Sequence, residues 1–386
     1  MSSVSAAQVI DFISDLVRIE SVTPWLVEGG AGERQVVAFL ADWCADLPVE
    51  IVQDEIAPGR FNLLVTWRGT GGGPTLCINA HADTVGYAGW VDTALVPRLD
   101  GDRLYGLGAA DDKGCCAAAL LALRALIATG VRLRGDLIIA CVADEEGVSL
   151  GSEVLVKSLK ADAAIVIEAD ALPKVVVEHQ GFGWIDVEFH GKAAHGSAPG
   201  VGVDAIVGLA EFLSRFHAWD LEHFAIEPEP RNGRTVFHTG TVRGGTDYAT
   251  YPSECVLGIE IGTQPGETLA DRVREIEAIL ADTREVLPGL TTDVVVRLDR
   301  SPFLARGHEQ LLASLDRAAQ LHLGTKLEQE GLNAWTDAAL LQDAGIPTVL
   351  LGPLGGNFHA PDEWVSIPEV VSLVDVLVGA IADYLG

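Results

Sequence analysis

Three short apolar runs of this chain each end in acidic or imidazole side chains. They are "CINAHAD" at 77–83, "CVADEEG" at 141–147 and "AIVIEAD" at 164–170. Nearly continuous apolar runs of this length are typical of strands that are covered on both faces of a sheet. Ligands of open α/β sheets bind beyond the carboxyl ends of such strands. The pattern therefore predicts a polar site at one edge of an α/β sheet.

Helical segments alternate with strands along the first 180 residues. Apolar residues recur three and four positions apart in 9–19 and 34–47, as in helices with one buried face. Segment 113–130 is rich in Ala and Leu and ends at Gly130, which predicts a strong helix. The predicted strands are 61–67, 75–80, 136–143 and 163–169. This order predicts a largely parallel or mixed sheet with helices on both faces.

The pattern changes after Gly181. "WIDVEFH" alternates strictly between apolar and polar residues, as a half-exposed strand does. The following segments predict the order strand, helix, strand, strand, helix, strand, which is the split βαβ of a ferredoxin-like unit. We therefore expect an inserted α+β domain over 182–298. The first α/β domain is then discontinuous, formed by 1–181 and 299–386.

Charge and cysteine content limit the partners and the compartment. The chain of 386 residues has a formal net charge of −29, which argues against nucleic acid and anionic membranes as partners. Its six cysteines form no CxxC pair, which predicts reduced thiols in a cytoplasmic protein. The first 22 residues carry acids within their apolar stretch and predict an amphipathic helix, not a signal peptide. No uninterrupted apolar run is long enough to cross a bilayer.

Acids and histidines gather at the ends of the predicted strands and at the start of one helix. The candidates are His81, Asp83, Asp111, Asp112, Glu145, Glu146, Glu168 and His359. Such a group repels itself unless a cation lies within it, because almost no Lys or Arg accompanies it. Imidazole together with carboxylate is typical of zinc or manganese sites. The lack of a cysteine among the candidates argues against a closed structural zinc site.

Each of these motifs also has an ordinary interpretation. A histidine two residues before an aspartate is often a solvated loop, and three consecutive acids often form an exposed turn. Asp111 and Asp112 could cap the helix that follows them. "GLGAAD" is similar to a dinucleotide-binding loop of a nicotinamide-dependent oxidoreductase, but Asp111 replaces the third glycine and would repel a pyrophosphate.

Taken together and in order, the motifs resemble a known family. "HADTV", "GLGAADDKG", "ADEEGVSLGS", "VIEAD", "AAHGSAPGVGVDAI" and "AWTDAALLQDAGIPTVLLGP…FHAPDEWV" are similar to the aminoacylase/acetylornithine-deacetylase family of dinuclear zinc peptidases. That family includes succinyl-diaminopimelate desuccinylase and bacterial glutamate carboxypeptidases. The resemblance runs from about residue 5 to the end, and it identifies fold and metal site far better than substrate.

The resemblance implies a set of metal ligands for two divalent ions, zinc in the first place and cobalt or manganese otherwise. His81 and Glu168 would hold one ion, and Glu146 and His359 the other. Asp111 would bridge both.

The resemblance also implies three roles outside the ligand set. Asp83 would orient His81 through its second ring nitrogen. Glu145 would act as general base toward the metal-activated water and then protonate the leaving amine. His195 would reach the active site of the partner subunit in a homodimer formed through the inserted domain, although it could also be an ordinary loop histidine.

Two positions depart from the family pattern. Ala249 stands where relatives carry an Asn, and Gly262 where they carry an Arg, and that pair grips the substrate carboxylate. Either another cation substitutes, with Arg243 and Arg234 as candidates, or the substrate has no free carboxylate there. The acyl group and the amine of the substrate therefore stay open.

The expected activity is metal-dependent hydrolysis of the amide bond of a small N-acyl amino acid or N-acylated amine. The alternative within hydrolases is a dipeptidase or carboxypeptidase. A metal-binding relative without catalytic activity is a further alternative, although such proteins commonly lose a ligand or the base.

Overall fold

The computed structural model describes residues 3–223 and 229–386. The chain divides into two compact units. The first contains residues 1–177, 305–330 and 336–386, and the second contains 178–304 and 331–335. We describe each unit by itself.

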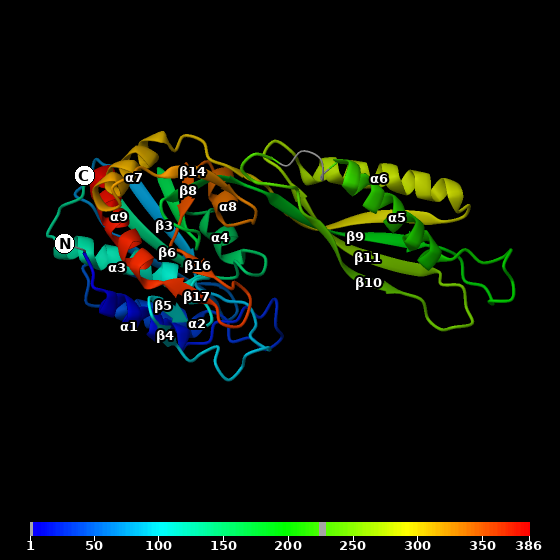
Figure 1. The fold of residues 1–386 in the computed structure, drawn as a ribbon, viewed down its shortest axis with the longest axis horizontal. Helices are drawn as coiled ribbons and strands as arrows, with labels where there is room; N and C mark the ends of the chain where they lie inside the picture. The colour runs from blue at the N-terminus through cyan, green and yellow to red at the C-terminus, as the bar shows by residue number, and fades with distance from the viewer. Residues whose placement is uncertain (1–2, 224–228) are drawn as a thin grey trace. The chain divides into compact units, whose positions relative to one another are not determined.

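A mixed sheet forms the centre of the first unit (Figure 1). The strand order is β1-β2-β6-β3-β7-β15-β8, with β3 parallel to both β6 and β7, and β15 parallel to β7. The strands β1 and β2 add to this parallel core in antiparallel orientation. Their bounds are β1 (Glu50–Ala57), β2 (Arg60–Trp67), β3 (Thr75–His81), β6 (Asp136–Val142), β7 (Ala163–Ile167), β8 (Lys174–His179) and β15 (Thr348–Leu351).

Helices cover this sheet, and α1, α2, α3, α7 and α9 share one apolar core with it. Helices α3 and α9 contact each other and the central strand β3, whereas α8 contacts β7 and β15. The bounds are α1 (Ala6–Val17), α2 (Arg34–Cys44), α3 (Lys113–Ala128), α4 (Leu150–Leu155), α7 (Glu309–His322), α8 (Ala338–Asp343) and α9 (Ile367–Leu385). None of the helices in the described ranges has both the length and the apolar character of a membrane span.

The sequence analysis did not predict a second, small sheet in this unit. Its order is β16-β17-β5-β4, and the strands are β4 (Arg98–Asp100), β5 (Arg103–Tyr105), β16 (Gly355–Gly356) and β17 (Trp364–Ser366). Strands of two or three residues are too short to show a period of two, so they could not be recognised from the sequence.

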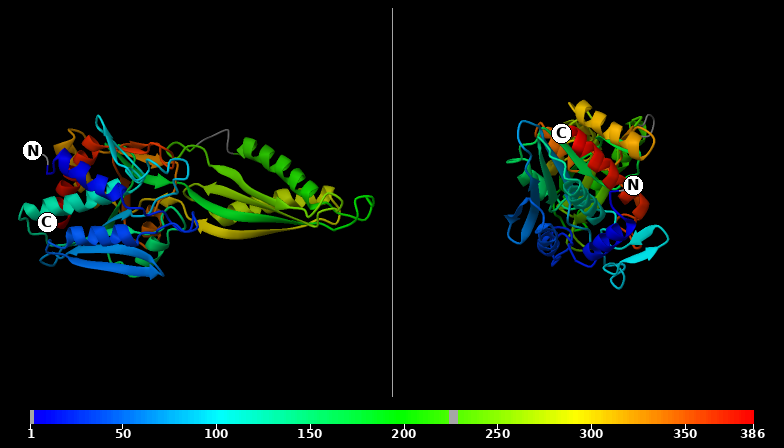
Figure 2. Two further views of the ribbon diagram at one scale, coloured as in Figure 1. Left: turned by 90° about the horizontal axis from the view of Figure 1, so that it is seen from below. Right: turned by 90° about the vertical axis from the view of Figure 1, so that its left-hand side faces the viewer.

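The second unit is an antiparallel sheet with two helices side by side on one face (Figures 1 and 2). Its elements are β9 (Gly181–His190), α5 (Ala205–His223), β10 (Phe237–Gly244), β11 (Glu254–Thr263), α6 (Leu269–Val286) and β12 (Thr291–Arg300), and the strand order is β10-β11-β9-β12. In β9, Ile185, Val187 and Phe189 are buried in the core, as the alternating pattern requires. The predicted fold class, an α/β domain with an inserted α+β domain, is confirmed.

The second unit extends beyond the expected range 182–298 on both sides. It begins at Glu178 and takes in the separate segment 331–335. Trp335 explains this, because its ring packs edge-on against Phe182 and His179. Strand β14 (Glu328–Leu332) thus begins in the first unit and ends in the second.

Candidate metal centre

Parallel pairing brings the predicted site residues to one edge of the main sheet. His81 is the last residue of β3, whereas Glu145 and Glu146 follow β6 and Glu168 follows β7. Because β3 is parallel to both neighbours, the three strand ends meet at the same edge. Asp111 approaches this edge from the loop before α3.

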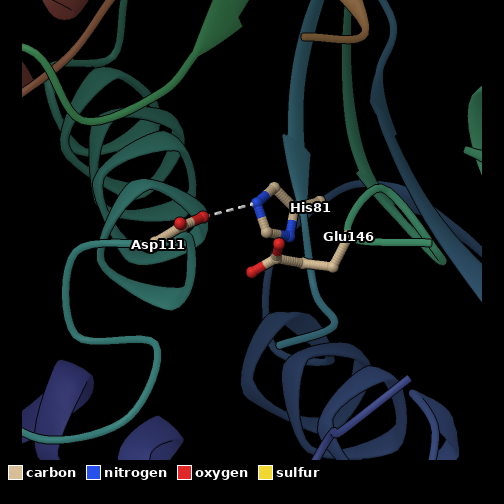
Figure 3. A group of neighbouring side chains, drawn as sticks. All are labelled: His81, Asp111 and Glu146. Carbon is tan, nitrogen blue, oxygen red and sulfur yellow. Dashed lines mark hydrogen bonds and ion pairs between the residues drawn. The ribbon is translucent and has the colours of Figure 1, made fainter. Parts of the chain in front are cut away.

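Asp111 lies between the two histidines. Its Oδ1 is 2.9 Å from His81 Nε2 (Figure 3). Its Oδ2 is 3.2 Å from His359 Nε2. Burial alone would raise the pKa of Asp111, but the hydrogen bonds from His359 and His81 outweigh it and hold the pKa well below its usual range. Each oxygen of this carboxylate thus faces a different imidazole, the arrangement that a bridging ligand requires.

One further carboxylate accompanies each histidine. Glu146 Oε2 lies 2.9 Å from His359 Nε2, and Glu168 Oε1 lies 3.5 Å from His81 Nε2. His81, Asp111 and Glu146 place one ligand atom each within 4.8 Å of one another, and Figure 3 shows these three side chains converging. Glu145 is also near, with its Oε2 at 4.0 Å from His81 Nε2.

Asp83 connects His81 to the turn that carries both glutamates. Its backbone carbonyl is 3.1 Å and its Oδ1 3.5 Å from His81 Nδ1, so the second ring nitrogen faces Asp83. Its two carboxylate oxygens accept hydrogen bonds from the backbone N–H groups of Glu145 and Glu146, at 3.1 and 3.2 Å. One buried side chain therefore fixes the relative positions of a histidine and two acids.

The donor set fits divalent cations. Burial raises the pKa of Glu146 to about 7 and raises the pKa values of Glu145 and Glu168 well above their usual range. Among the described residues, nothing donates a hydrogen bond to the buried Glu146 Oε1. A cation at this place would remove the cost of burying these acids and would give the orphaned oxygen a partner.

The ordinary interpretation predicted that the Asp112 side chain caps helix α3. The structure shows no such cap. Asp112 occupies the N-cap position without a side-chain cap bond, and its Oδ2 accepts the His81 backbone N–H at 2.9 Å. Asp112 also groups with His81 and Glu168, with ligand atoms within 4.8 Å of one another. The sequence offered no sign of this contact because residues 81 and 112 are distant along the chain.

A remote arginine neutralises the first acid of "CVADEEG". Asp144 is buried, and its Oδ1 accepts hydrogen bonds from Thr23 Oγ1 at 2.7 Å and Arg60 Nη2 at 2.9 Å. Arg60 also pairs with Glu33, a buried carboxylate, at 2.5 Å. Asp144 takes a left-handed backbone conformation, with φ 68°, where the chain turns toward Glu145. The charge of Asp144 is thus matched by a residue that lies 84 positions earlier in the chain.

We expect Arg60→Ala to lower the free energy of unfolding by about 3–5 kcal/mol, because it leaves two buried carboxylates without their partner. Arg68→Ala is a matched control, since Arg68 pairs with Glu50 and Asp136 at the surface. Exposed pairs contribute about 1 kcal/mol or less. Urea unfolding followed by circular dichroism compares the two variants. Equally small losses of unfolding free energy in both variants would show that the buried ion pairs of Arg60 do not stabilise the fold.

Glu363 is a residue to which the sequence analysis assigned no role. It is buried, and its carboxylate accepts the backbone N–H groups of Gly108, Ala110 and Asp111 at 2.9 to 3.0 Å. Burial raises the pKa of Glu363 to about 7. The side chain thus holds the loop that presents Asp111. Its only sequence signal was its place in "HAPDEWV", four residues after His359.

Three further candidates lie in the second unit. His195 is exposed, and its Nδ1 lies 2.8 Å from Ser197 Oγ. Arg243 is exposed on strand β10. Arg234 forms an ion pair with Asp220. One of the two arginines considered as a substitute anchor for the substrate carboxylate is therefore already paired.

A two-unit α/β chain with histidines and carboxylates converging at parallel strand ends has the features of a metal-dependent hydrolase. Comparison with known proteins agrees. Residues 77–383 match the model of "Peptidase family M20/M25/M40". The chain is 30% identical over 350 residues to acetylornithine deacetylase of Salmonella typhimurium (strain LT2), covering 86% of this chain and 85% of the relative. It is 27% identical over 384 residues to the enzyme of the same name from Aliivibrio salmonicida, covering 95% and 96%.

Solved structures share the fold at lower identity. A tripeptidase from Staphylococcus aureus has a TM-score of 0.82 at 23% identity, covering 98% of this chain and 99% of its own. Human carnosine dipeptidase 1 has a TM-score of 0.75 at 15% identity, covering 98% and 96%. The Bacillus subtilis YXEP protein, titled a dinuclear metal binding peptidase, has a TM-score of 0.73 at 14% identity, covering 98% of each chain.

The chain belongs to peptidase family M20/M25/M40. It is therefore a metal-dependent hydrolase that acts on amide bonds, and the resemblance found in the sequence is confirmed.

Proposed function

We propose that this enzyme removes the acyl group from a small N-acyl amino acid or N-acylated amine. The observation that carries the proposal is the Asp111 carboxylate, whose two oxygens contact His81 and His359 at 2.9 and 3.2 Å while acids flank both histidines. The matching relatives named acetylornithine deacetylase favour a deacylase over other amide hydrolases.

In this proposal, five side chains hold two divalent ions. They are His81 and Glu168 on one ion, Glu146 and His359 on the other, and Asp111 between them. The imidazole and carboxylate donors suit zinc, with cobalt or manganese as alternatives. When bound, the ions lower the pKa of a shared water and polarise the scissile carbonyl.

The remaining steps belong to Glu145 and Asp83. Glu145 accepts the proton of the attacking water at its carboxylate and then delivers it to the nitrogen of the leaving amine. Asp83 holds Glu145 by the N–H contact at 3.1 Å and faces His81 Nδ1, which leaves Nε2 available as the ligand atom.

A hydrolysis screen tests the proposal. The enzyme is stripped with a chelator and reloaded with zinc, cobalt or manganese. It is then offered N-acetyl, N-succinyl and N-carbamoyl amino acids beside dipeptides, and release of the free amine is measured. Restoration of acyl-substrate cleavage by metal supports a deacylase, and no cleavage of any acyl substrate by any reloaded form contradicts it.

A dipeptidase or carboxypeptidase is the second candidate. It is favoured by the structural likeness to a tripeptidase and to carnosine dipeptidase 1. The same screen separates the candidates, because a dipeptidase releases two amino acids and leaves N-acetyl amino acids largely uncleaved.

We further propose a cytoplasmic homodimer that pairs through the second unit. The six cysteines are buried and free, which supports a reducing compartment. Strand β10 is an edge strand of its sheet, and unpaired edges are usually covered. In the dimer, His195 of each subunit would reach the partner's metal centre and polarise the carbonyl. The charge of −29 argues against nucleic acid as a partner.

Mixing two inactive variants tests the shared site. His195→Ala and Glu145→Ala homodimers should each be nearly inactive, whereas a heterodimer contains one site with both groups intact. With half of the dimers mixed, we expect up to about a quarter of wild-type activity to return. Native mass spectrometry checks that subunits exchange. Exchange without recovered activity would show that His195 does not act across the dimer.

A further inference from the structure

A loop at the start of the chain exposes three consecutive apolar side chains. Trp25, Leu26 and Val27 are 49%, 44% and 41% exposed. Single exposed apolar residues are ordinary, but a run of them is unfavourable unless it has a function. The run is the more unusual in a chain with a net charge of −29, whose surface is otherwise rich in acids.

Hydrogen bonds hold this loop in one conformation. The N–H groups of Leu26 and Val27 both donate to the carbonyl of Thr23 at 3.2 Å, and Gly32 N–H donates to the Val22 carbonyl at 3.0 Å. Thr23 is itself fixed, since its N–H donates to the Thr84 carbonyl at 3.0 Å. The exposed side chains therefore project from a rigid base.

The loop is built on the two turns that carry the candidate active-site residues. Thr23 Oγ1 donates to Asp144, the residue before Glu145, and its N–H donates to Thr84, the residue after Asp83. A Cβ placed on Gly147 would lie 3.1 Å from Trp25 Cβ, so Trp25 packs directly against the residue that follows Glu146. Half of the Trp25 surface remains open beside the catalytic turn.

A second half-exposed aromatic ring lies next to His359. Phe358 is 44% exposed and immediately precedes His359, whose Nε2 is 2.9 Å from Glu146 Oε2. Its ring packs beside Gly355, which in turn contacts Ala110, the residue before Asp111. His359 itself has a side chain that is 54% exposed, whereas that of His81 is 1% exposed. The exposed histidine of the centre is thus the one that Phe358 precedes, and Trp25 lies beside the turn that carries Glu146.

The charges of this part of the structure do not favour a charged substrate group. Arg60, which the loop covers at Gly32, is held by Glu33 and Asp144 at 2.5 and 2.9 Å. The loop's own charged residue is Glu28, which would repel a carboxylate. An apolar group would instead bury the exposed surfaces of the aromatic rings.

We propose that Trp25, Leu26, Val27 and Phe358 form an apolar rim that binds an apolar group of the substrate next to the scissile amide. This inference rests on the proposed function and specifies its substrate class. The preferred substrates carry a medium-length alkyl or aromatic group, on either the acyl or the amine side, in place of a charged one.

Two series of substrates test the rim with zinc-loaded enzyme. The acyl arm compares N-acetylalanine with N-hexanoylalanine, and the amine arm compares N-acetylalanine with N-acetylphenylalanine. In the series whose added apolar group contacts the rim, we expect kcat/KM to be at least about tenfold higher for the more apolar substrate. Trp25→Ala should reduce that ratio about tenfold, and Trp25→Phe should keep most of it.

A binding measurement and a matched control accompany the kinetics. Calorimetry on Glu145→Ala enzyme, with and without Trp25→Ala, gives Kd for the same substrates with minimal turnover. Trp25→Ala should weaken binding of the apolar substrate by a similar factor and leave binding of N-acetylalanine unchanged. Leu321→Ala removes an apolar side chain on α7 that is even more exposed, at 77%, and should leave the ratio unchanged. If the wild-type enzyme cleaves none of these amides, the proposed function fails and this inference with it. If it cleaves them with a ratio that Trp25→Ala does not alter, or without preference in either arm, the apolar rim alone is wrong.

Discussion

Replacing Glu145 with alanine should reduce turnover by about two orders of magnitude or more, which is the usual contribution of a general base. Metal content should stay at the wild-type level, because in our assignment Glu145 faces the attacking water and is not a ligand. Turnover is measured with the best substrate of the hydrolysis screen, and metal content by elemental analysis of the same preparation.

Glu146→Ala is the matched control, since the two acids are adjacent and the backbone N–H groups of both donate to Asp83. It should weaken metal occupancy first and activity as a consequence, so that excess metal restores part of the activity. Excess metal should not rescue Glu145→Ala. Exchanged phenotypes would mean that the roles of the two acids are reversed.

Asp111→Ala should lose both metal ions together with all measurable activity. The physical reason is that each carboxylate oxygen faces a different histidine, so in the proposed assignment removing the side chain takes one ligand from each ion. Metal-to-protein ratios after dialysis against metal-free buffer measure the effect.

Asp170→Ala controls for the loss of any acid near the site, because Asp170 follows Glu168 by two residues and lies 4.0 Å from Lys174. It should retain both ions. An Asp111→Ala enzyme with full metal content and activity would rule out the bridge.

The long, periodic elements of this fold could be predicted from the sequence, and the short ones could not. The buried strands β3, β6 and β7 consist mainly of apolar residues, and β9 alternates over its whole length. The small sheet of β4, β5, β16 and β17 has no such signal, because its pairing joins residues near 100 to residues near 360. The boundary of the second unit also depends on a distant residue, Trp335, which packs against Phe182.

The candidate site shows the same division. Histidines and acids at strand ends could be recognised because each follows a recognisable strand, and parallel pairing then places them together. Arg60 could not be linked to Asp144, because 84 residues separate them and the contact exists only after folding. The role of Glu363 could not be predicted for a similar reason, since its partners are backbone N–H groups some 250 residues earlier.

The bidentate grip of Asp83 on the turn after β6 has an evolutionary consequence. Because one carboxylate holds the N–H groups of both residues, a shift of Glu146, the proposed metal ligand, must carry Glu145, the proposed proton acceptor, with it. Substitutions at Asp83, Glu145 and Glu146 should therefore be strongly non-additive, with a double change costing much less than the sum of its parts. Selection can then adjust the surrounding loops for new substrates while the distance between ligand and base stays constant.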